Sequence, residues 1–455
     1  MRGNVSPQKR QSMLEEDIRT LIPKMAIPTI VAQMITTIYN MVDTFFVSTL
    51  GTSATAAVGV NSSLQRTITL IGSLIGAGAC SYIARLLGAK KQEDADRVLS
   101  TSFFVGIALS VILLMAGRLV VNPLVMFMGA TEDSAQYAAD YATYVLYAAP
   151  FMVGSFILNM CLRSEGSATY AMIGIGFGGI LNCFLDPLFI YTFHLGVAGA
   201  SIATAVSQLV SFTILLIPYA RKKTGVSIAI RKFKLIAEDV KQVLSIGGTS
   251  FFRSAFSVVS MVVMNRVAGG FSTAALAAIS VANRIMEFPF AIILGFGQGY
   301  QPVVGFNWGA KSWKRVWQSY HFATKVAILG GVIMGAVILI TASPIIRVFN
   351  TQADAEVLRL GILCVRAQCL VLWIHAWGST TNMFYGGIGK AREALLMSTA
   401  RQGYCFIPVA VIAPALLGVA GIATTQAIAD LVSLLVIVPL TVRVKRLIHE
   451  NEQAC

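Results

Sequence analysis

The sequence has few charged residues. Asp, Glu, Lys and Arg together make up 12% of its 455 residues, 56% are hydrophobic, and the mean hydropathy is +0.72. Soluble proteins carry about 25% charged residues, so the shortage excludes an ordinary soluble protein and predicts a chain that crosses a membrane many times. The formal net charge is +14, but the basic residues cluster between apolar runs. We therefore interpret them as markers of cytoplasmic loops and expect no nucleic-acid partner.

The sequence also lacks the motifs of catalysis and nucleotide binding. It contains no His-Glu-x-x-His, no Gly-x-Ser-x-Gly and no Gly-x-x-x-x-Gly-Lys followed by Ser or Thr. A membrane-embedded enzyme would need a convergent catalytic set, such as Asp-rich metal motifs on loops, and none is present. We therefore expect no enzyme and no cofactor, and we expect an ion gradient, of H⁺ or Na⁺, to supply the energy.

Metal-ligand spacing is missing from the cysteines. The seven cysteines are odd in number, and we interpret six of them as small apolar residues rather than metal ligands or disulfide partners. These six lie in or beside apolar runs: Cys80, Cys161, Cys183, Cys364, Cys369 and Cys405. A signal peptide is not indicated either, because the polar first twenty residues contain no apolar core before a cleavage site.

Long apolar runs dominate what the sequence does contain. A transmembrane helix needs about 20 such residues, and no continuous strand pattern competes with helix. We predict an all-α polytopic membrane protein of twelve transmembrane helices, with runs at 21–49, 56–87, 98–121, 137–162, 168–193, 197–219, 243–268, 275–305, 319–343, 357–386, 395–416 and 418–442. The expected domains are a cytoplasmic N-terminus at 1–20, a first lobe at 21–220, a cytoplasmic linker at 221–242, a second lobe at 243–446 and a cytoplasmic tail at 447–455.

The two sets of six runs repeat each other. Gly88-Ala-Lys90 returns as Gly309-Ala-Lys311 and Pro123 as Pro344, both at an offset of 221 (309 − 88 and 344 − 123). Leu195-Gly-Val-Ala-Gly199 returns 222 residues later (417 − 195), and Asn159-Met160 returns 223 residues later (382 − 159). An even number of helices per repeat gives both lobes one orientation and a pseudo-two-fold axis along the membrane normal. Two such lobes leave a central cleft suited to alternating access.

Lysine and arginine predict the orientation. They flank the runs on one side only, whereas the opposite loops near Gly51, His194, Gly269 and Gly418 carry almost none. The positive-inside rule therefore predicts that both termini are cytoplasmic. The residues counted are Arg2, Lys9, Arg10, Arg19, Lys24, Arg85, Lys90, Lys91, Arg97, Arg221, Lys222, Lys223, Arg231, Lys232, Lys234, Lys241, Lys311, Lys314, Arg315, Lys390, Arg392, Arg443, Lys445 and Arg446.

Two acidic residues lie deep in the apolar runs of the first lobe. Asp186 falls at membrane depth, with Asn182 one helical turn earlier to hydrogen-bond it and Pro187 beside it to free a backbone carbonyl. Asp43 lies fifteen residues (43 − 28) after Pro28, which is about 22 Å along a helix that the proline bends. A carboxylate at membrane depth usually faces the interior of the helix bundle or a water-filled cavity. We favour a binding site for H⁺ or Na⁺ formed by both acids over a structural pairing with arginine.

The second lobe offers further candidates. Glu287 is accompanied by Asn283 and Arg284, and either an Arg284–Glu287 pair or a role in substrate binding or ion coupling explains them. His375 lies between two tryptophans and suits a packed aromatic cluster better than a cation-attracting wall. Four further arginines lie in apolar runs, where they face the cleft or reach to an interface: Arg253, Arg266, Arg366 and Arg401. A tyrosine stripe at 137, 141, 144 and 147 is interpreted first as a membrane-interface anchor.

These residues together resemble the multidrug and toxin extrusion (MATE) family, and most nearly its bacterial DinF/MepA-like branch. The likeness rests on the two similar sets of six helices and on Pro28 with Asp43. It also rests on the segment from Gly76-Ala-Gly78 to Gly88-Ala-Lys90, which is repeated from Gly297-Gln-Gly299 to Gly309-Ala-Lys311. The last feature is Asn182-x-x-x-Asp186-Pro187 together with Thr204. The likeness covers nearly the whole chain.

The resemblance implies a transporter of the bacterial plasma membrane that exports amphipathic, often cationic, drugs in exchange for H⁺ or Na⁺. It implies Asp43, Asn182, Asp186 and Thr204 as the ion site and Pro28 as the bend of helix 1. Some members also use acids in helices 7 and 10, but this chain has none in run 357–386 and offers only Glu287 nearby. We expect a functional monomer. A flippase of a lipid-linked precursor is the nearest alternative, although such proteins typically have extra helices.

Overall fold

The computed structural model describes residues 7–130, 132–349 and 355–453. Arg2, one of the basic residues counted above, and the last two residues of the predicted tail lie outside these ranges. The described chain is almost entirely helical and contains no strand. Eleven of its helices are long and apolar enough to cross a membrane, which confirms the predicted all-α, multi-pass fold.

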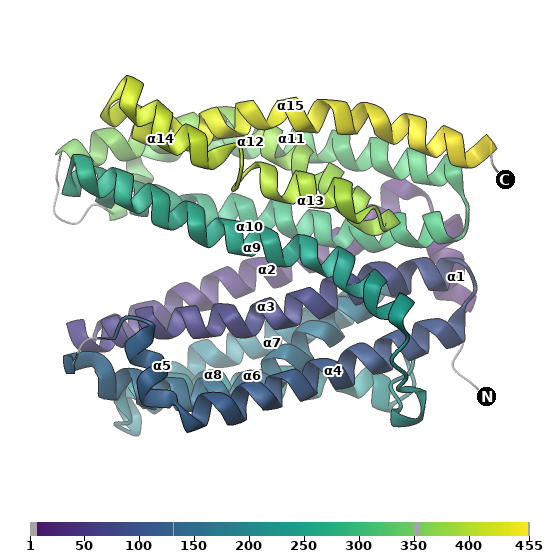
Figure 1. Ribbon diagram of the computed structural model, residues 1–455, viewed down its shortest axis with the longest axis horizontal. Coiled ribbons are helices and arrows are strands. Elements are labelled where there is room, and N and C mark those ends of the chain that lie inside the picture. The colour runs from purple at the N-terminus through teal and green to yellow at the C-terminus, as the bar shows by residue number, and fades with distance from the viewer. Residues whose placement is uncertain (1–6, 131, 350–354, 454–455) are drawn as a thin grey trace.

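The first half of the chain forms one lobe, seen in the lower half of Figure 1. Its short helix α1 leads into the long helices, and a π-helical turn at Leu188–Thr192 separates α7 from α8. The bounds are α1 Pro7–Glu15, α2 Ile18–Ser48, α3 Thr52–Gly88, α4 Gln92–Leu119, α5 Val121–Phe127, α6 Glu132–Ser164, α7 Ala168–Pro187 and α8 Gly196–Ala220.

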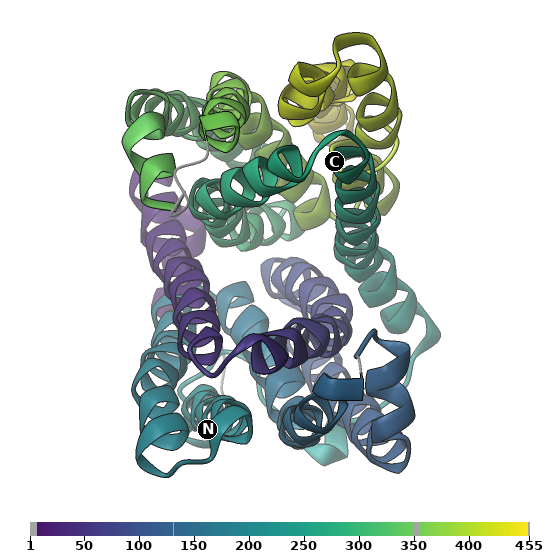
Figure 2. The same ribbon diagram turned by 90° about the vertical axis from the view of Figure 1, so that its left-hand side faces the viewer.

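The second half forms the other lobe, in the upper half of Figure 1. A linker containing a 3₁₀ turn at Ile230–Lys232 connects the lobes. The bounds are α9 Ala237–Phe271, α10 Thr273–Gly309, α11 Trp313–Phe349, α12 Ala355–Ile388, α13 Ala391–Ala400, α14 Phe406–Leu417 and α15 Val419–Gln453. Figure 2 shows the two lobes nearly end-on, as two separate clusters of helices.

The predicted helix at 395–416 is broken. It forms α13 and α14, which are separated by turns at 401–405. Gly403 weakens the helix at the break, and Pro408 falls in the first turn of α14, where its missing N–H needs no partner. The Ser260 hydroxyl of α9 donates a hydrogen bond to the Gln402 carbonyl in the break. The interruption is therefore supported from a neighbouring helix and is not simply a frayed end.

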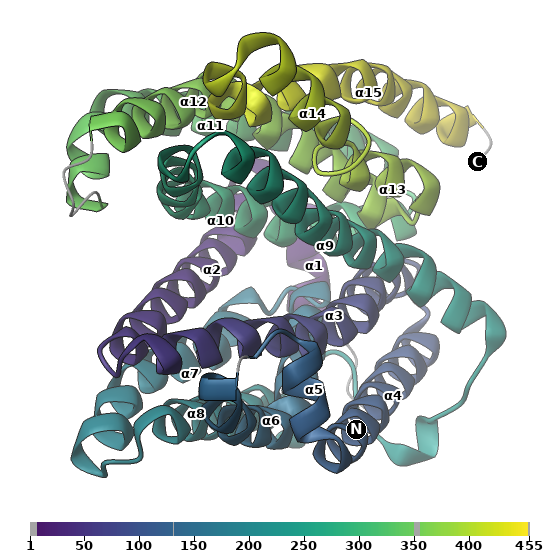
Figure 3. The ribbon, with the colours of Figure 1, turned by 60° about the vertical axis from the view of Figure 1, so that its left-hand side comes forward.

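The lobes touch at the end of the molecule that carries both chain termini, here called the terminal end. A Cβ on Gly88 would lie 2.0 Å from the Phe306 carbonyl oxygen, and a Cβ on Gly309 would lie 2.0 Å from that of Arg85. Because Gly88 and Gly309 are repeat-related, this reciprocal contact places the pseudo-two-fold axis between α3 and α10. Figure 3 shows α3 and α9 converging toward the terminal end and separating toward the opposite, far end.

Side-chain bonds reinforce the closure at the terminal end. The Tyr82 hydroxyl donates to Asp239 at 3.2 Å, and Arg97 forms an ion pair with the same carboxylate at 2.8 Å. Arg163 donates to Gln298 at 2.7 Å. Each of these bonds joins a residue of the first lobe to one of the second. The described conformation is therefore closed at the terminal end.

Candidate functional site

A buried carboxylate lies near the end of α7. Asp186 is fully buried and Asn182 is 2% exposed. The Asn182 amide donates to Asp186 Oδ1 at 3.1 Å, but Asp186 Oδ2 and Asn182 Oδ1 have no hydrogen-bond partner. The α-helix ends at Pro187, which has no N–H, and continues as the π-helical turn. The chain is thus irregular directly after its buried acid.

The second predicted acid lies close to the first. Asp43 projects from α2, is partly buried, and leaves its Oδ1 atom without a partner. It is near enough to Asp186 for the two carboxylates to interact electrostatically, and α2 packs along α7. The structure therefore brings together the two acids that the sequence analysis singled out. Pro28 lies within α2, which continues through it without interruption.

A tyrosine joins this site that the sequence analysis placed elsewhere. Tyr141 is 1% exposed, accepts a hydrogen bond from Gln65 at 3.2 Å and interacts with the side chain of Thr204. Its hydroxyl group also interacts electrostatically with both carboxylates. The expectation of a membrane-interface stripe was wrong for Tyr141, because one face of α6 is packed inside the lobe. Tyr137, one turn before Tyr141, and Tyr147 are exposed.

The site contains more acceptor atoms than donors. Thr204 is 8% exposed and donates to the Ala200 carbonyl at 3.1 Å, and the buried Ser207 hydroxyl, one turn later on α8, has no partner. Four buried oxygens thus lack partners: Asp43 Oδ1, Asn182 Oδ1, Asp186 Oδ2 and Ser207 Oγ. Buried polar atoms are normally satisfied. Oxygen ligands of this kind suit a hard cation or a proton, so the residues present fit a coupling ion.

The second-lobe candidates divide into two groups. Asn283, Arg284 and Glu287 are exposed on α10, and within the described chain Arg284 and Glu287 form no salt bridge. Glu287 lies near enough to Arg66 of the first lobe and to Arg284 to interact electrostatically with both. His375 instead lines a cavity of about 270 Å³, with its ring edge-on to Phe290 at 5.0 Å.

This cavity brings together two arginines expected at the cleft or at an interface and two residues that the sequence patterns did not point to. Arg253, Arg401 and Gln402 line it, and Arg66 reaches it from α3 of the first lobe. Arg401 forms an ion pair with Asp430 of α15 at 2.8 Å. The sequence sign of this site is the pair Gly403 and Pro408. These residues interrupt the helix of the second repeat that corresponds to the irregular α7.

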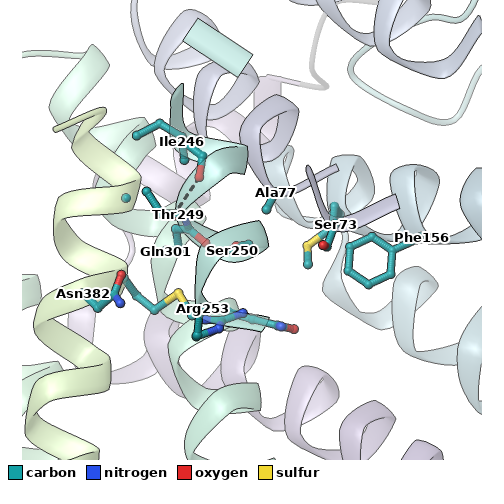
Figure 4. Close-up of a pocket in the computed structure, with 13 residues that line it drawn as sticks. Ser73, Ala77, Phe156, Ile246, Thr249, Ser250, Arg253, Gln301 and Asn382 are labelled. Atoms are coloured by element: carbon teal, nitrogen blue, oxygen red, sulfur yellow. Dashed lines mark hydrogen bonds between the residues drawn. The ribbon is translucent and has the colours of Figure 1, made fainter. Parts of the chain in front are cut away.

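A smaller cavity of about 40 Å³ lies between the lobes. Figure 4 shows Ser73, Ala77 and Phe156 of the first lobe facing Thr249, Ser250 and Arg253 of α9. Gln301 and Asn382 complete the second-lobe wall. Arg253 and Asn382 line both cavities, so the two spaces are neighbours.

Known proteins share this architecture. The multidrug export protein MepA of Staphylococcus saprophyticus is 26% identical over 410 residues, which cover 89% of each chain. MepA of Staphylococcus aureus strain NCTC 8325 is 26% identical over 406 residues, again 89% of each chain. A solved structure described as the outward-facing conformation of a multidrug resistance MATE family transporter of the MOP superfamily has a TM-score of 0.91 at 27% identity. That match covers 97% of this chain and 98% of that one.

The family model named MatE matches residues 28–188 and 249–412. The first matched segment contains Asp43, Asn182 and Asp186, and the second contains Arg253 and Arg401. The matched segments fall in both lobes and make up more than half of the sequence, so the chain belongs to the MatE family.

Proposed function

We propose that this protein is a multidrug antiporter of the bacterial plasma membrane, which exchanges H⁺ or Na⁺ for small amphipathic, often cationic, molecules. The observation that carries the proposal is the pair Asp43 and Asp186, whose buried oxygens lack hydrogen-bond partners. Such a pair attracts a cation, because binding one relieves the repulsion between the carboxylates. The names of the staphylococcal relatives support multidrug export as the activity.

The ion site consists of Asp43, Asn182, Asp186 and Thr204. Asp43 and Asp186 supply the charge, while Asn182 donates a hydrogen bond to Asp186 through its amide and leaves its own carbonyl oxygen without a partner. Thr204 contributes a hydroxyl oxygen from α8. A bound H⁺ or Na⁺ compensates one of the two negative charges, and when the ion leaves the two carboxylates repel each other again. This difference in charge is what an ion gradient can act on.

The ion shifts the balance between two arrangements of the lobes. Both termini and the basic loops lie in the cytoplasm by the positive-inside rule, so closure at the terminal end corresponds to an outward-facing state. Ion uptake from outside compensates negative charge in the pocket and lets α2 bend at Pro28, so that substrate leaves. Ion release to the cytoplasm restores the inward-facing state. Ion binding must favour one state over the other, because equal affinity would shift nothing.

Substitution of the two acids tests the proposal. In proteoliposomes with an imposed H⁺ or Na⁺ gradient, we expect Asp43→Asn and Asp186→Asn each to abolish gradient-driven efflux of a cationic dye such as ethidium. Glu238→Gln is the matched control, because Glu238 is exposed at the start of α9 and accepts only from Gln242. Full efflux by either asparagine variant would show that the ion site is assigned wrongly.

A further inference from the structure

The broken helix of the second lobe opens at the wall of the larger cavity. The turns at 401–405 separate α13 from α14, and Arg401 and Gln402 of that segment line the cavity. Irregular backbone at membrane depth is tolerated only where it is buried in protein or lines a cavity. In transporters, interrupted helices at equivalent positions of two repeats are a sign of binding sites. The break is therefore a feature of a site, and the cavity beside it is the candidate.

The cavity wall is rich in positive charge. Arg66, Arg253 and Arg401 all line it, whereas among the residues that the structure describes the only carboxylate bonded to any of the three is Asp430, which pairs with Arg401. Glu287 interacts with Arg66 at longer range but does not line the cavity. Arg401 Nη2 is buried without a hydrogen-bond partner. Partly buried Arg253 forms no hydrogen bond or ion pair within the described residues.

Uncharged groups around these arginines shape the rest of the site. The Arg401 guanidinium lies over the Phe290 ring, with its Cζ atom 4.4 Å from the ring centre. This cation–π contact helps to fix the position of the guanidinium. Hydroxyl and amide groups of Ser254, Ser257, Ser379 and Asn382 line the same space. Apolar side chains of Leu294 and Ile437 complete it. A ligand that fits this lining carries one negative group for the guanidinium groups and an apolar body.

We propose that this second-lobe cavity binds the anionic group, a carboxylate or a phosphate, of an amphipathic molecule. Guanidinium groups bind such oxyanions with charge-assisted hydrogen bonds, and Arg253 and the free Nη2 atom of Arg401 are the donors. The anion compensates charge that the chain itself leaves unpaired. The inference rests on the proposed transport function for its context, and it widens the substrate class from cations to molecules that bear an anion.

A pair of fluorescent probes of nearly equal shape tests the proposal. Dansyl-glycine carries a carboxylate, and dansyl-glycinamide is its neutral analogue. The full-length protein is reconstituted in nanodiscs of zwitterionic lipid without any ion gradient, and each probe is titrated by fluorescence. We expect saturable binding of dansyl-glycine that is about tenfold tighter than that of the amide, the scale of a charge-assisted hydrogen bond.

Substitutions then locate the binding. Arg253→Gln is expected to weaken the binding of dansyl-glycine about tenfold and to leave the binding of dansyl-glycinamide unchanged. Arg266→Gln, at an exposed arginine of the same helix, is expected to change neither. Arg401→Gln alone would leave the buried Asp430 carboxylate unpaired and risk misfolding, so it is combined with Asp430→Asn. The double variant is expected to weaken the binding of dansyl-glycine but not that of dansyl-glycinamide. Equal affinity for both probes, no saturable binding, or equal loss in Arg253→Gln and Arg266→Gln would overturn the proposal.

Further arms identify the source of the anion and separate this proposal from the transport function. Anionic lipid added to the nanodiscs competes with dansyl-glycine if a lipid headgroup is the occupant, and does not compete if a free amphiphile is. Gradient-driven dye efflux is measured in parallel on the wild-type protein. A failure of gradient-driven efflux with intact dansyl-glycine binding would thus count against the proposed antiport alone.

Discussion

Tyr141 connects the two acids of the first lobe to the lobe interior. Its hydroxyl accepts from Gln65 and interacts with Thr204, so three helices, α3, α6 and α8, meet at one oxygen. Tyr141 is therefore proposed as a positioning residue for the ion site, because it orders groups around the carboxylates.

Tyr141→Phe tests this role. Removing a buried hydroxyl removes about 0.5–1.5 kcal/mol of interaction, so we expect the Km for the coupling ion to rise about threefold to tenfold, at tenfold per 1.4 kcal/mol. Ion-dependent dye efflux in proteoliposomes measures the Km. Tyr147→Phe, at an exposed position of the same helix, serves as the control. A loss of thermal stability with an unchanged Km would assign Tyr141 to packing only.

Glu165 lies outside the membrane spans, in the turn between α6 and α7, and ties the linker to the first lobe. It is 1% exposed and accepts hydrogen bonds from the backbone N–H groups of Gly225 and Val226. Burial raises the pKa of Glu165 to about 7, and nearby Lys9 and the two N–H groups oppose that rise.

A pH dependence of stability follows from this carboxyl. Because the folded pKa lies above the unfolded value, the stability that Glu165 contributes is complete below pH about 4.5 and declines as the pH rises through about 7. We expect the wild type to lose more thermal stability than Glu165→Gln between pH 5 and pH 8, measured on purified protein. If the two proteins lose the same amount, while Glu238→Gln behaves as the wild type, Glu165 is not the titrating group.

At the scale of elements, α3 and α10 meet backbone to backbone at Gly88 and Gly309. Gly88 and Gly309 each place their backbone against a carbonyl of the other helix, a contact that only glycine permits. We expect Gly88→Val to prevent closure at the terminal end and to abolish dye efflux, because its Cβ would overlap the Phe306 carbonyl.

The matched control is Gly330→Val on α11, since a Cβ there meets nothing within 4 Å. Labelling of a cysteine introduced at Ala77, which lines the small cavity between the lobes, reports closure: reagent added from the cytoplasmic side should reach it more readily in Gly88→Val. Normal efflux by Gly88→Val would show that tight closure is not needed.

Sequence patterns predicted most elements, and the broken helix shows where they fail. Hydrophobic runs predicted the membrane helices because length and apolar content are local properties. The interruption at 401–405 depends on Ser260 and on the cavity beside it, which lie on or between other helices. Asp43 and Asp186 were predictable because an acid in an apolar run is rare, whereas Tyr141 was not, since its burial depends on packing within the lobe. Arg401 was noticed, but its partner Asp430 was not.

At the scale of the whole molecule, the proposed ion coupling limits what can be exported. One proton moving through 100 mV and one pH unit gains about 2.3 and 1.4 kcal/mol, which supports about 500-fold accumulation of a neutral substrate. When one proton is exchanged for one monovalent cation, no net charge crosses the membrane and only about tenfold remains for one pH unit.

Separate gradients test this balance. We expect one-for-one export of a monovalent cationic dye to respond to a pH or Na⁺ gradient but not to voltage alone, which a potassium diffusion potential in proteoliposomes can impose. A response to voltage alone would mean that more than one ion moves per cycle. Unchanged export when the pH gradient and the Na⁺ gradient are both removed would contradict ion coupling as formulated.

The glycine contact between α3 and α10 also bears on how the lobes separate. Carbonyl oxygens press directly on bare backbone there, with no flexible side chain to stretch or rearrange as the helices move apart. A small displacement therefore breaks the whole contact at once, and half-separated positions gain nothing from it. The contact therefore favours two positions of the lobes, in contact or fully apart. A transporter with such a contact has little tendency to occupy partly separated states that leak.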